Sequence, residues 1–424
     1  MRQEFSGYQL GEPAYRRIAV ALFLAGMATF AQLYSVQPLL PALAADFDLS
    51  ATASTLSLSV STAALGVALL LFGPLSEVVG RTRLIHFSLF ASALVGLLSA
   101  AAPSWETLLC LRAVEGLTIA GLPAVGMAYL REEVHADVHA RAAGLYVAGA
   151  AMGGMSGRLI AGAMGDLGGW RWGLGAVAVI ALVSAVCVRL LLPPSRNFSP
   201  VPPHPHVLLA MTGRLLRDPA QLALYGIAAT FMGAFVAVYN AMSFRLVGAP
   251  YFLSLTAAGL VFLVYPVGAV SSTYAGVLAS RLGRRSVLPV AGVVTLAGLL
   301  ITLLQPLALV VVGLAVMTAG FFAAHSVASG WVATRAHVGV GGTGQAASLY
   351  LFSYYLGSSV FGSLAGDAWS SGGWPSVVLL AGGLVLVGSV LALLLRRTQS
   401  LLSTVRPGDA GGHVTQSSVH PERT

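Results

Sequence analysis

The chain has 424 residues, of which 57% are hydrophobic and only 9% are charged, and its formal net charge is +8 at pH 7. Soluble proteins carry about 25% charged residues because a folded surface must be solvated by water. A soluble chain of this length would also divide into several domains, each with a polar exterior. The composition therefore excludes a soluble enzyme and a disordered chain, and it predicts a protein that lies within a membrane.

The chain has 23 basic residues, and all of them are arginine. The lack of lysine excludes chemistry that needs an ε-amine, such as a phosphate-binding loop, a pyridoxal Schiff base or the nucleotide site of a kinase. The two cysteines, Cys110 and Cys187, match no redox or zinc spacing. The run 132–141 has histidines and carboxylates at helical spacing, but such mixed charges usually meet water in a loop. We therefore expect no cofactor and no metal site.

Twelve apolar segments follow one another along the chain, and each approaches the roughly 20 residues that a helix needs to cross a bilayer. They cover residues 18–39, 53–76, 85–102, 107–130, 142–163, 172–192, 220–244, 255–278, 287–304, 307–332, 346–365 and 375–395. They form an N-terminal group within residues 1–192 and a C-terminal group within residues 220–397. The proline-rich stretch 193–219 predicts a cytoplasmic linker, and the polar stretch 398–424 predicts a flexible tail.

The arginines are distributed unevenly between the two sides of these spans. One side holds most of them, namely Arg2, Arg16, Arg17, Arg81, Arg83, Arg131, Arg141, Arg189, Arg196, Arg214, Arg217, Arg281, Arg284, Arg285, Arg335, Arg396 and Arg397. The other side has Arg171 and Arg245. Because cytoplasmic loops carry the excess of basic residues, we expect both termini to be cytoplasmic. The basic excess then reflects topology and contact with membrane lipids, and we expect no nucleic-acid partner.

The first span also has a second interpretation. Arg16 and Arg17 before an apolar run, with small residues at 42–44 after it, are typical of a cleaved signal peptide. Cleavage would leave eleven of the twelve spans and would reverse the side on which the arginine-rich loops lie. We therefore expect the first span to remain in the protein.

The two groups of spans resemble each other at a nearly constant shift. The segment 73–81 recurs as 276–284, and Gly-Gly-Trp at 168–170 recurs at 372–374. Leu-Tyr at 145–146 recurs in the same order at 349–350. An ordered series of matches predicts a duplicated six-helix unit, which is one architecture of transporters with a site between the halves.

The loop after the second span reads Gly73-x-Leu-Ser-Glu77-x-x-Gly80-Arg81-x-Arg83. It resembles the signature loop of the major facilitator superfamily, with Glu77 in the place of the usual aspartate, and the later copy has Ser280 there. With the twelve spans and the repeat, the resemblance covers nearly the whole chain. It implies an all-α membrane protein of two pseudo-symmetric six-helix bundles. It also implies a cytoplasmic gating loop made of Gly73, Glu77, Gly80, Arg81, Arg83, Gly276, Gly283 and Arg284.

The fourth span contains two charged residues, Arg112 and Glu115. Residues at i and i+3 share one helix face and can pair, and charges within a membrane are costly enough to indicate function. In the antiporters that this span resembles, the arginine is associated with proton coupling, which implies that Arg112 and Glu115 carry it here. An ion pair that only stabilises packing is the alternative interpretation.

The fifth span has glycines at Gly149, Gly153, Gly154 and Gly157, a spacing that lets helices approach closely. It resembles the antiporter motif of superfamily exporters, with Gly154 in place of the characteristic proline and Arg158 in place of the last glycine. The form is similar to the YnfM-type branch of bacterial inner-membrane exporters, close to arabinose-efflux-like permeases. Arg158 could contact an anionic substrate or Glu115, or it could pair with Asp166.

Other polar residues fall within spans that line the central cavity of the fold that this chain resembles. With Arg158, the candidates for that cavity are Gln32, Tyr34, Gln37, Tyr239, Asn240, His325, Tyr350 and Tyr354. Each taken alone is also explained by a hydrogen bond between helices. His325 is a second candidate proton carrier because histidine titrates near neutral pH.

These features predict a monomeric secondary transporter of a bacterial inner membrane, which works by alternating access without nucleotide hydrolysis. We expect proton-coupled efflux of a small organic solute such as a drug, sugar or metabolite. Proton-coupled uptake or uniport of a sugar or organic acid is an alternative. A membrane-embedded enzyme would need convergent catalytic groups within the bilayer, and a receptor or channel would not explain the repeat.

Overall fold

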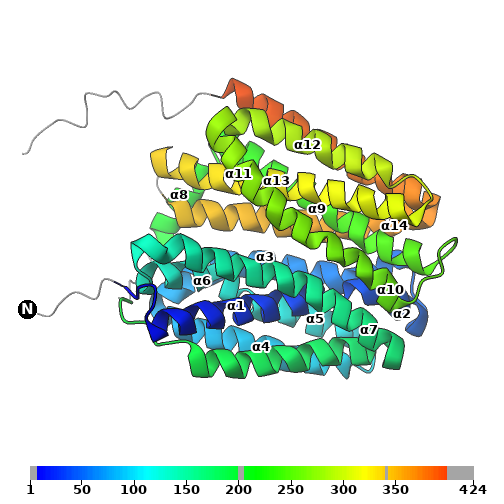
Figure 1. Ribbon diagram of the computed structural model, residues 1–424, viewed down its shortest axis with the longest axis horizontal. Helices are drawn as coiled ribbons and strands as arrows, with labels where there is room; N and C mark the ends of the chain where they lie inside the picture. The colour runs from blue at the N-terminus through cyan, green and yellow to red at the C-terminus, as the bar shows by residue number, and fades with distance from the viewer. Residues whose placement is uncertain (1–6, 199–204, 340–341, 399–424) are drawn as a thin grey trace, which may run out of the picture.

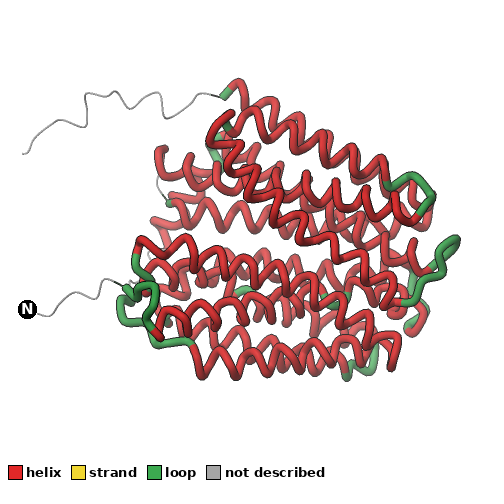
Figure 2. The backbone as a smooth tube through the Cα atoms, viewed as in Figure 1, coloured by secondary structure: helices red, strands yellow, loops and turns green. Residues whose placement is uncertain are grey.

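The structure is a computed structural model that describes residues 7–198, 205–339 and 342–398, and these residues are almost entirely helical (Figure 2). The N-terminal part comprises α1 (Pro13–Tyr34), the short helix η1 (Gln37–Leu39), α2 (Leu40–Asp46), α3 (Ala51–Val79), α4 (Arg81–Ala100), α5 (Trp105–Ile119), α6 (Gly121–Glu133) and α7 (Ala136–Leu191). The C-terminal part comprises α9 (Pro219–Val247), α10 (Leu255–Gly259), η2 (Leu260–Val264), α11 (Tyr265–Leu282), α12 (Arg284–Ile301), α13 (Leu307–Gly339), α14 (Thr343–Leu394) and η3 (Leu395–Arg397).

The helices α7 and α14 are each too long for one crossing. The 56 residues of α7 would extend about 84 Å as one helix, against a hydrocarbon core of about 30 Å. Non-helical angles interrupt it at Gly168 and at Gly169, where φ is +78°, and they interrupt α14 at Gly372 and at Gly373, where φ is +63°. Ten helices of the described chain are long and apolar enough to cross a membrane. Because α7 and α14 are each divided in two by these glycines, the described residues form twelve membrane-length segments, as predicted.

The two parts form two bundles that lie one above the other in Figure 1. The turn between α3 and α4, the turn between α11 and α12, the C-terminal end of α6 and the helix α8 lie at one end of the bundles, called the linker end here. The Gly-Gly kinks lie at the opposite end, called the kink end, near α2 and α10. Glycines form the turns because φ is +97° at Gly80 and +84° at Gly283, in the region that side chains disfavour.

Side-chain caps set where several helices begin. Ser50 accepts from the amide of Ala53 at 3.1 Å to start α3, and Asp218 accepts from the amide of Ala220 at 3.0 Å to start α9. Pro219 follows Asp218 as the first residue of α9, where its missing N–H is not needed. The stretch 193–219 that was predicted as a linker contains one helix, α8 (Pro205–Leu215). The predicted tail lies outside the described residues apart from Thr398.

Candidate functional site

Arg112 and Glu115 form an ion pair within the N-terminal bundle. Arg112 Nη1 lies 2.7 Å from Glu115 Oε2, and the two side chains are only 1% and 2% exposed. Both residues are on α5, three positions apart, so the helix itself brings their side chains together. Two charges removed from water are tolerated only when each has a partner and its remaining hydrogen bonds are satisfied. This requirement accounts for the contacts that surround the pair.

Arg112 also holds the main chain of two neighbouring helices. Its Nε donates to the carbonyl of Ser57 on α3 at 3.1 Å, and its Nη2 donates to the carbonyl of Leu33 on α1 at 2.9 Å. The amide of Gln32 donates to Glu115 Oε1 at 3.4 Å, so both members of the pair contact α1. The cavity beside them measures about 10 Å³, which leaves room for about one water molecule.

The helical conformation is interrupted between α1 and η1, where these contacts are made. The helix α1 ends at Tyr34, and Pro38 lies within the following turn of η1, where it cannot donate a backbone hydrogen bond. Carbonyl groups at the end of a helix need donors from elsewhere. Arg112 supplies such donors to Gln32, at 3.4 Å, and to Leu33. The segment Gln32–Gln37, called the α1 break here, is thus held in place by a side chain of another helix.

A second buried arginine, Arg158 on α7, lies at the other end of the α1 break. Its side chain is 1% exposed, and its Nε donates to Gln37 Oε1 at 2.7 Å. Its guanidinium carbon lies 4.3 Å from the ring centre of Tyr34, 4.7 Å from that of Phe262 and 4.8 Å from that of Tyr265. Among the described residues, it forms no salt bridge with a carboxylate. Aromatic faces attract a cation electrostatically without neutralising its charge.

The two sequence-based alternatives for Arg158 as an ion-pair partner are not observed. Asp166 instead accepts from the backbone amides of Leu255 and Thr256 at 2.9 and 2.7 Å, where it caps α10. Glu115 pairs with Arg112. Aromatic rings of both bundles instead cover Arg158, with Tyr34 from the N-terminal bundle and Phe262 from the C-terminal one.

Gln37 connects Arg158 to the C-terminal bundle. Gln37 Nε2 donates to Asn240 Oδ1 on α9 at 2.7 Å, and the Ser243 hydroxyl donates to the Gln37 carbonyl at 3.0 Å. Asn240 in turn donates to the carbonyl of Gly362 on α14 at 3.1 Å. Gln37 and Asn240 are both 0% exposed. An uninterrupted row of hydrogen bonds therefore runs from Arg158 through Gln37 into the other bundle.

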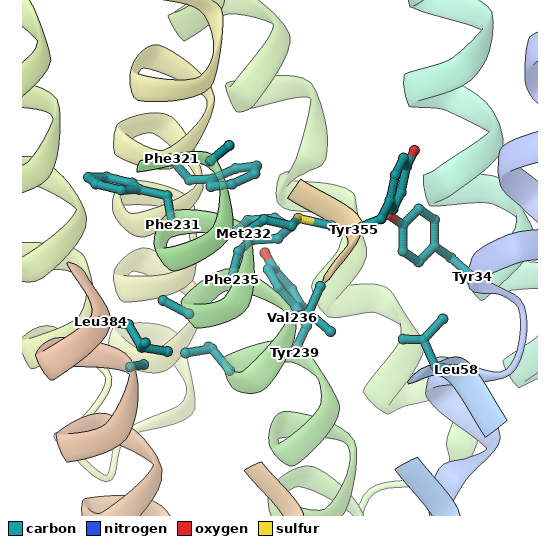
Figure 3. Packing of buried hydrophobic residues seen from close by; sticks show 14 of the residues in the cluster. Tyr34, Leu58, Phe231, Met232, Phe235, Val236, Tyr239, Phe321, Tyr355 and Leu384 are labelled. Carbon is teal, nitrogen blue, oxygen red and sulfur yellow. The ribbon is translucent and has the colours of Figure 1, made fainter. Parts of the chain in front are cut away.

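The remaining cavity candidates belong to an aromatic cluster in the C-terminal bundle, of which Figure 3 shows Phe235, Tyr239 and Phe321. The ring of Phe235 stacks on that of Phe321 at 4.0 Å, and it lies 4.8 Å from that of Tyr239. The Tyr239 hydroxyl is 2.8 Å from that of Thr318. His325 joins this cluster through Tyr350 and Tyr354. The Tyr350 hydroxyl is 3.0 Å from His325 Nδ1, and the rings of His325 and Tyr354 are 4.9 Å apart.

The glycines of α7 serve two purposes. A Cβ atom at Gly149, Gly153 or Gly157 would overlap the backbone of α1, so these residues allow the two helices to touch. Gly154 differs from the prediction, because it faces Arg158 and its carbonyl accepts a hydrogen bond from Arg158 Nη1. The related motif has proline at the position of Gly154. In this chain the guanidinium of Arg158 lies beside Gly154 instead.

The predicted gating loop is ordered differently in its two copies. Arg81 Nη2 lies 2.7 Å from Glu77 and 3.0 Å from Glu132, and a further nitrogen of Arg81 donates to the hydroxyl of Ser76. In the second copy, Arg284 forms no such pair among the described residues. The other named positions complete these turns or lie beside them: Gly80 and Gly283 at positive φ, Arg83 on the exposed side of α4, and Gly73 and Gly276 inside helices with open space around them.

The predicted candidates thus fall into three groups that lie in contact along one path. Gln32 belongs with Arg112 and Glu115, Tyr34 with Arg158, and Tyr239 with the aromatic cluster. Sequence reasoning missed Phe262 and Tyr265, which complete the box around Arg158. Both residues lie in an apolar part of the eighth span, where no charged or amide side chain drew attention to them. In the sequence Val-Phe-Leu-Val-Tyr-Pro, the only visible feature is a pair of aromatic residues before a proline.

Comparison with known proteins identifies the family to which the chain belongs. The family model for the Major Facilitator Superfamily matches residues 21–249. The chain is 43% identical over 384 residues to the inner membrane transport protein YnfM of Escherichia coli (strain K12), covering 91% of this chain and 90% of that one. It belongs to the Major Facilitator Superfamily. It is therefore a multi-pass membrane transport protein and not an enzyme, as the signature loop indicated.

Other relatives and solved structures agree with this membership. The chain is 40% identical over 389 residues to the uncharacterized MFS-type transporter YybF of Bacillus subtilis (strain 168), covering 92% of this chain and 95% of that one. A bacterial homologue of the human lysosomal transporter Spinster superposes with a TM-score of 0.71 over 92% of this chain and 98% of that one, at 13% identity. The nucleoside transporter NupG superposes equally well, with a TM-score of 0.71 at 13% identity over 90% of this chain and 99% of that one. These distant structures share the superfamily fold.

Proposed function

We propose that this member of the superfamily exports a small organic solute from the cytoplasm in exchange for protons. The single observation that carries the proposal is the buried Arg112–Glu115 pair, which contacts the same α1 break that Arg158 contacts. A carboxylate within a low-dielectric bundle can carry a proton, and its ionised form is held by the adjacent guanidinium. A proton bound at Glu115 would therefore change the contacts of Arg112.

The substrate site of this proposal lies between the bundles, around Arg158 and the aromatic cluster. No carboxylate of the described residues pairs with the N–H donors of Arg158, and Tyr34, Phe262 and Tyr265 surround it with apolar faces. A solute with an anionic group and an apolar body would fit both features. Substrate and Gln37 would compete for the same guanidinium, so binding would loosen the hydrogen bond between Arg158 and Gln37.

The proposed transport cycle follows from the end at which contacts hold the two bundles together. Hydrogen bonds between the halves gather at the kink end, where Thr52 donates to Asp367 at 2.7 Å and the Ser363 hydroxyl to that of Ser59 at 2.7 Å. With the termini cytoplasmic, as the arginine distribution predicts, this conformation faces inward. Solute would enter from the linker end, and opening of the kink end would expose Glu115 to external protons. Protonation of Glu115 would break its pair with Arg112 and shift the α1 break, releasing the solute outside.

Transport into inside-out vesicles tests this proposal. A panel of organic acids and amphipathic drugs is offered to vesicles that contain the protein, with and without an imposed proton gradient, acid inside. Proton-driven accumulation of at least one compound supports the proposal. Entry that ignores the gradient and stops when the two concentrations are equal would instead identify a uniporter, and loss of preloaded compound driven by the gradient would identify uptake.

A further inference from the structure

The turn between α11 and α12 repeats the turn between α3 and α4 but lacks its acids. In the first copy, Arg81 pairs with Glu77 and Glu132. At a shift of 203 residues, as from Arg81 to Arg284, the two glutamates correspond to Ser280 and Arg335. One partner of the arginine has therefore become neutral, and the other has become positive.

A cavity of about 740 Å³ is present at this place in the second copy. Its lining comes from α11, α12 and α13 and includes Ser280, Arg284, Arg285, Trp331 and Arg335. No aspartate or glutamate is among its lining residues in the part of the chain that the structure describes. The cavity is thus lined by arginines without an acid, whereas Arg81 in the first copy is paired with two glutamates.

Little negative charge is available to neutralise this cavity. Between residues 220 and 398 the only acidic residue is Asp367, and it bonds Thr52 at the kink end. Asp218, just before this range, pairs with Arg335 at 2.6 Å. Arg285 donates to the backbone carbonyls of Arg396 and Thr398, which are neutral acceptors. The helix α12 also begins here without a side-chain cap, so its N-terminal dipole adds to the positive potential.

We propose that this cavity binds the phosphate of an anionic phospholipid. Guanidinium groups match phosphate oxygens in charge and geometry. The exposed face of α11 leads away from the cavity through Tyr274, Val277 and Leu278, which are 70%, 46% and 46% exposed. Such an apolar face suits acyl chains. Trp331 lies in the cavity wall, and tryptophan favours the boundary between head groups and acyl chains. A soluble phosphate would use the arginines but not the apolar face.

The test uses the full-length protein in nanodiscs of phosphatidylcholine, in which the fraction of phosphatidylglycerol with brominated acyl chains is raised. Bromine quenches a nearby tryptophan, and the difference between the wild type and Trp331→Phe isolates the Trp331 signal. We expect phosphatidylglycerol to quench Trp331 at lower fractions than brominated phosphatidylcholine does. Equal quenching by the two lipids would overturn the proposal.

Variants at Ser280 distinguish a head group that binds in this cavity from a general attraction between anionic lipids and a basic protein surface. Ser280→Glu restores the acid four residues before Arg284, as Glu77 stands before Arg81, and we expect it to weaken the preference for phosphatidylglycerol about fivefold. Ser280→Gln has the same size without the charge and should keep the preference. Arg284→Gln should weaken it likewise, whereas Arg217→Gln, an exposed arginine of the linker outside the cavity lining, should not. If Ser280→Glu and Ser280→Gln weakened the preference for phosphatidylglycerol equally, or Arg284→Gln and Arg217→Gln did so, the proposed site would be contradicted.

Inorganic phosphate distinguishes the two sources of the same chemistry. It is added to the protein in pure phosphatidylcholine nanodiscs, and the emission of Trp331 is recorded. No change at millimolar phosphate supports the lipid, whereas a saturable change that Ser280→Glu abolishes would replace the lipid by a soluble phosphate compound.

Discussion

Arg112 and Arg158 hold adjacent residues of one chain segment, although they belong to different helices. Arg112 donates to the carbonyl of Leu33 at 2.9 Å, and the guanidinium of Arg158 lies 4.3 Å from the ring centre of the next residue, Tyr34. The α1 break between Gln32 and Gln37 is the shared contact. A movement of either arginine therefore changes the surroundings of the other.

The first prediction concerns coupling to protons. Glu115→Gln keeps the shape of the side chain but removes its charge and its ability to carry a proton. We expect solute transport that no longer responds to a proton gradient, measured in vesicles for whichever compound the wild type accumulates. Glu106→Gln, the same substitution at an exposed position of the same helix, is the control and should behave as wild type. A Glu115→Gln protein with unchanged gradient dependence would contradict the proton role.

The second prediction concerns close packing between α1 and α7. Gly153→Ala would place a methyl group on the carbonyl of Met27 and force the helices apart. We expect a loss of about 1–3 kcal/mol in the free energy of unfolding, which is typical of overpacking, read from thermal unfolding in detergent. Gly144→Ala on the same helix has no atom within 4 Å of the added methyl group. It should leave stability unchanged or raise it by up to about 1 kcal/mol, because alanine favours helix.

A third prediction addresses the contact between the bundles. Gln37 and Asn240 are fully buried and bond each other at 2.7 Å, so Gln37→Ala, Asn240→Ala and the double variant form a mutant cycle. We expect the two substitutions to be coupled by about 0.5–3 kcal/mol in the free energy that separates the closed kink end from the open one. Distances between spin labels on the exposed kink-end turns of the two bundles would report wider opening in each variant. Strictly additive effects would show that the pair does not hold the bundles together.

The fourth prediction concerns the start of the linker. Glu133 is 0% exposed, and its Oε1 accepts from the backbone amides of Arg196 and Asn197 at 2.6 and 3.0 Å. Glu133→Ala leaves these amides without their acceptor, which we expect to cost about 1–3 kcal/mol. Faster cleavage of the linker by added protease would report the loss. Asp137→Ala removes an acid that is 86% exposed and should leave the cleavage rate unchanged.

Much of the fold was predictable because a membrane imposes simple rules on sequence. Helices must be long and apolar, so all twelve segments could be located, with ends that differ from the observed ones by up to about seven residues. The pair of Arg112 and Glu115 followed from their spacing on one helix. The surroundings of Arg158 did not follow, because they depend on how η2 and the α1 break pack against α7. Apolar residues such as Phe262 carry no sign of which neighbour they will cover.

The two copies of the six-helix unit have diverged in their chemistry. The N-terminal copy holds the buried carboxylate Glu115, whereas the C-terminal copy, with Asp367 as its single acid between residues 220 and 398, supplies most of the aromatic surface. In the proposed exporter, the proton site thus lies in the first half alone, whereas the cargo site is shared between Arg158 and Tyr34 of the first half and the aromatic cluster of the second. Substitutions among the aromatic residues of the second half can then adapt the site to a cargo with a different apolar body, while the half that uses the proton gradient is left intact.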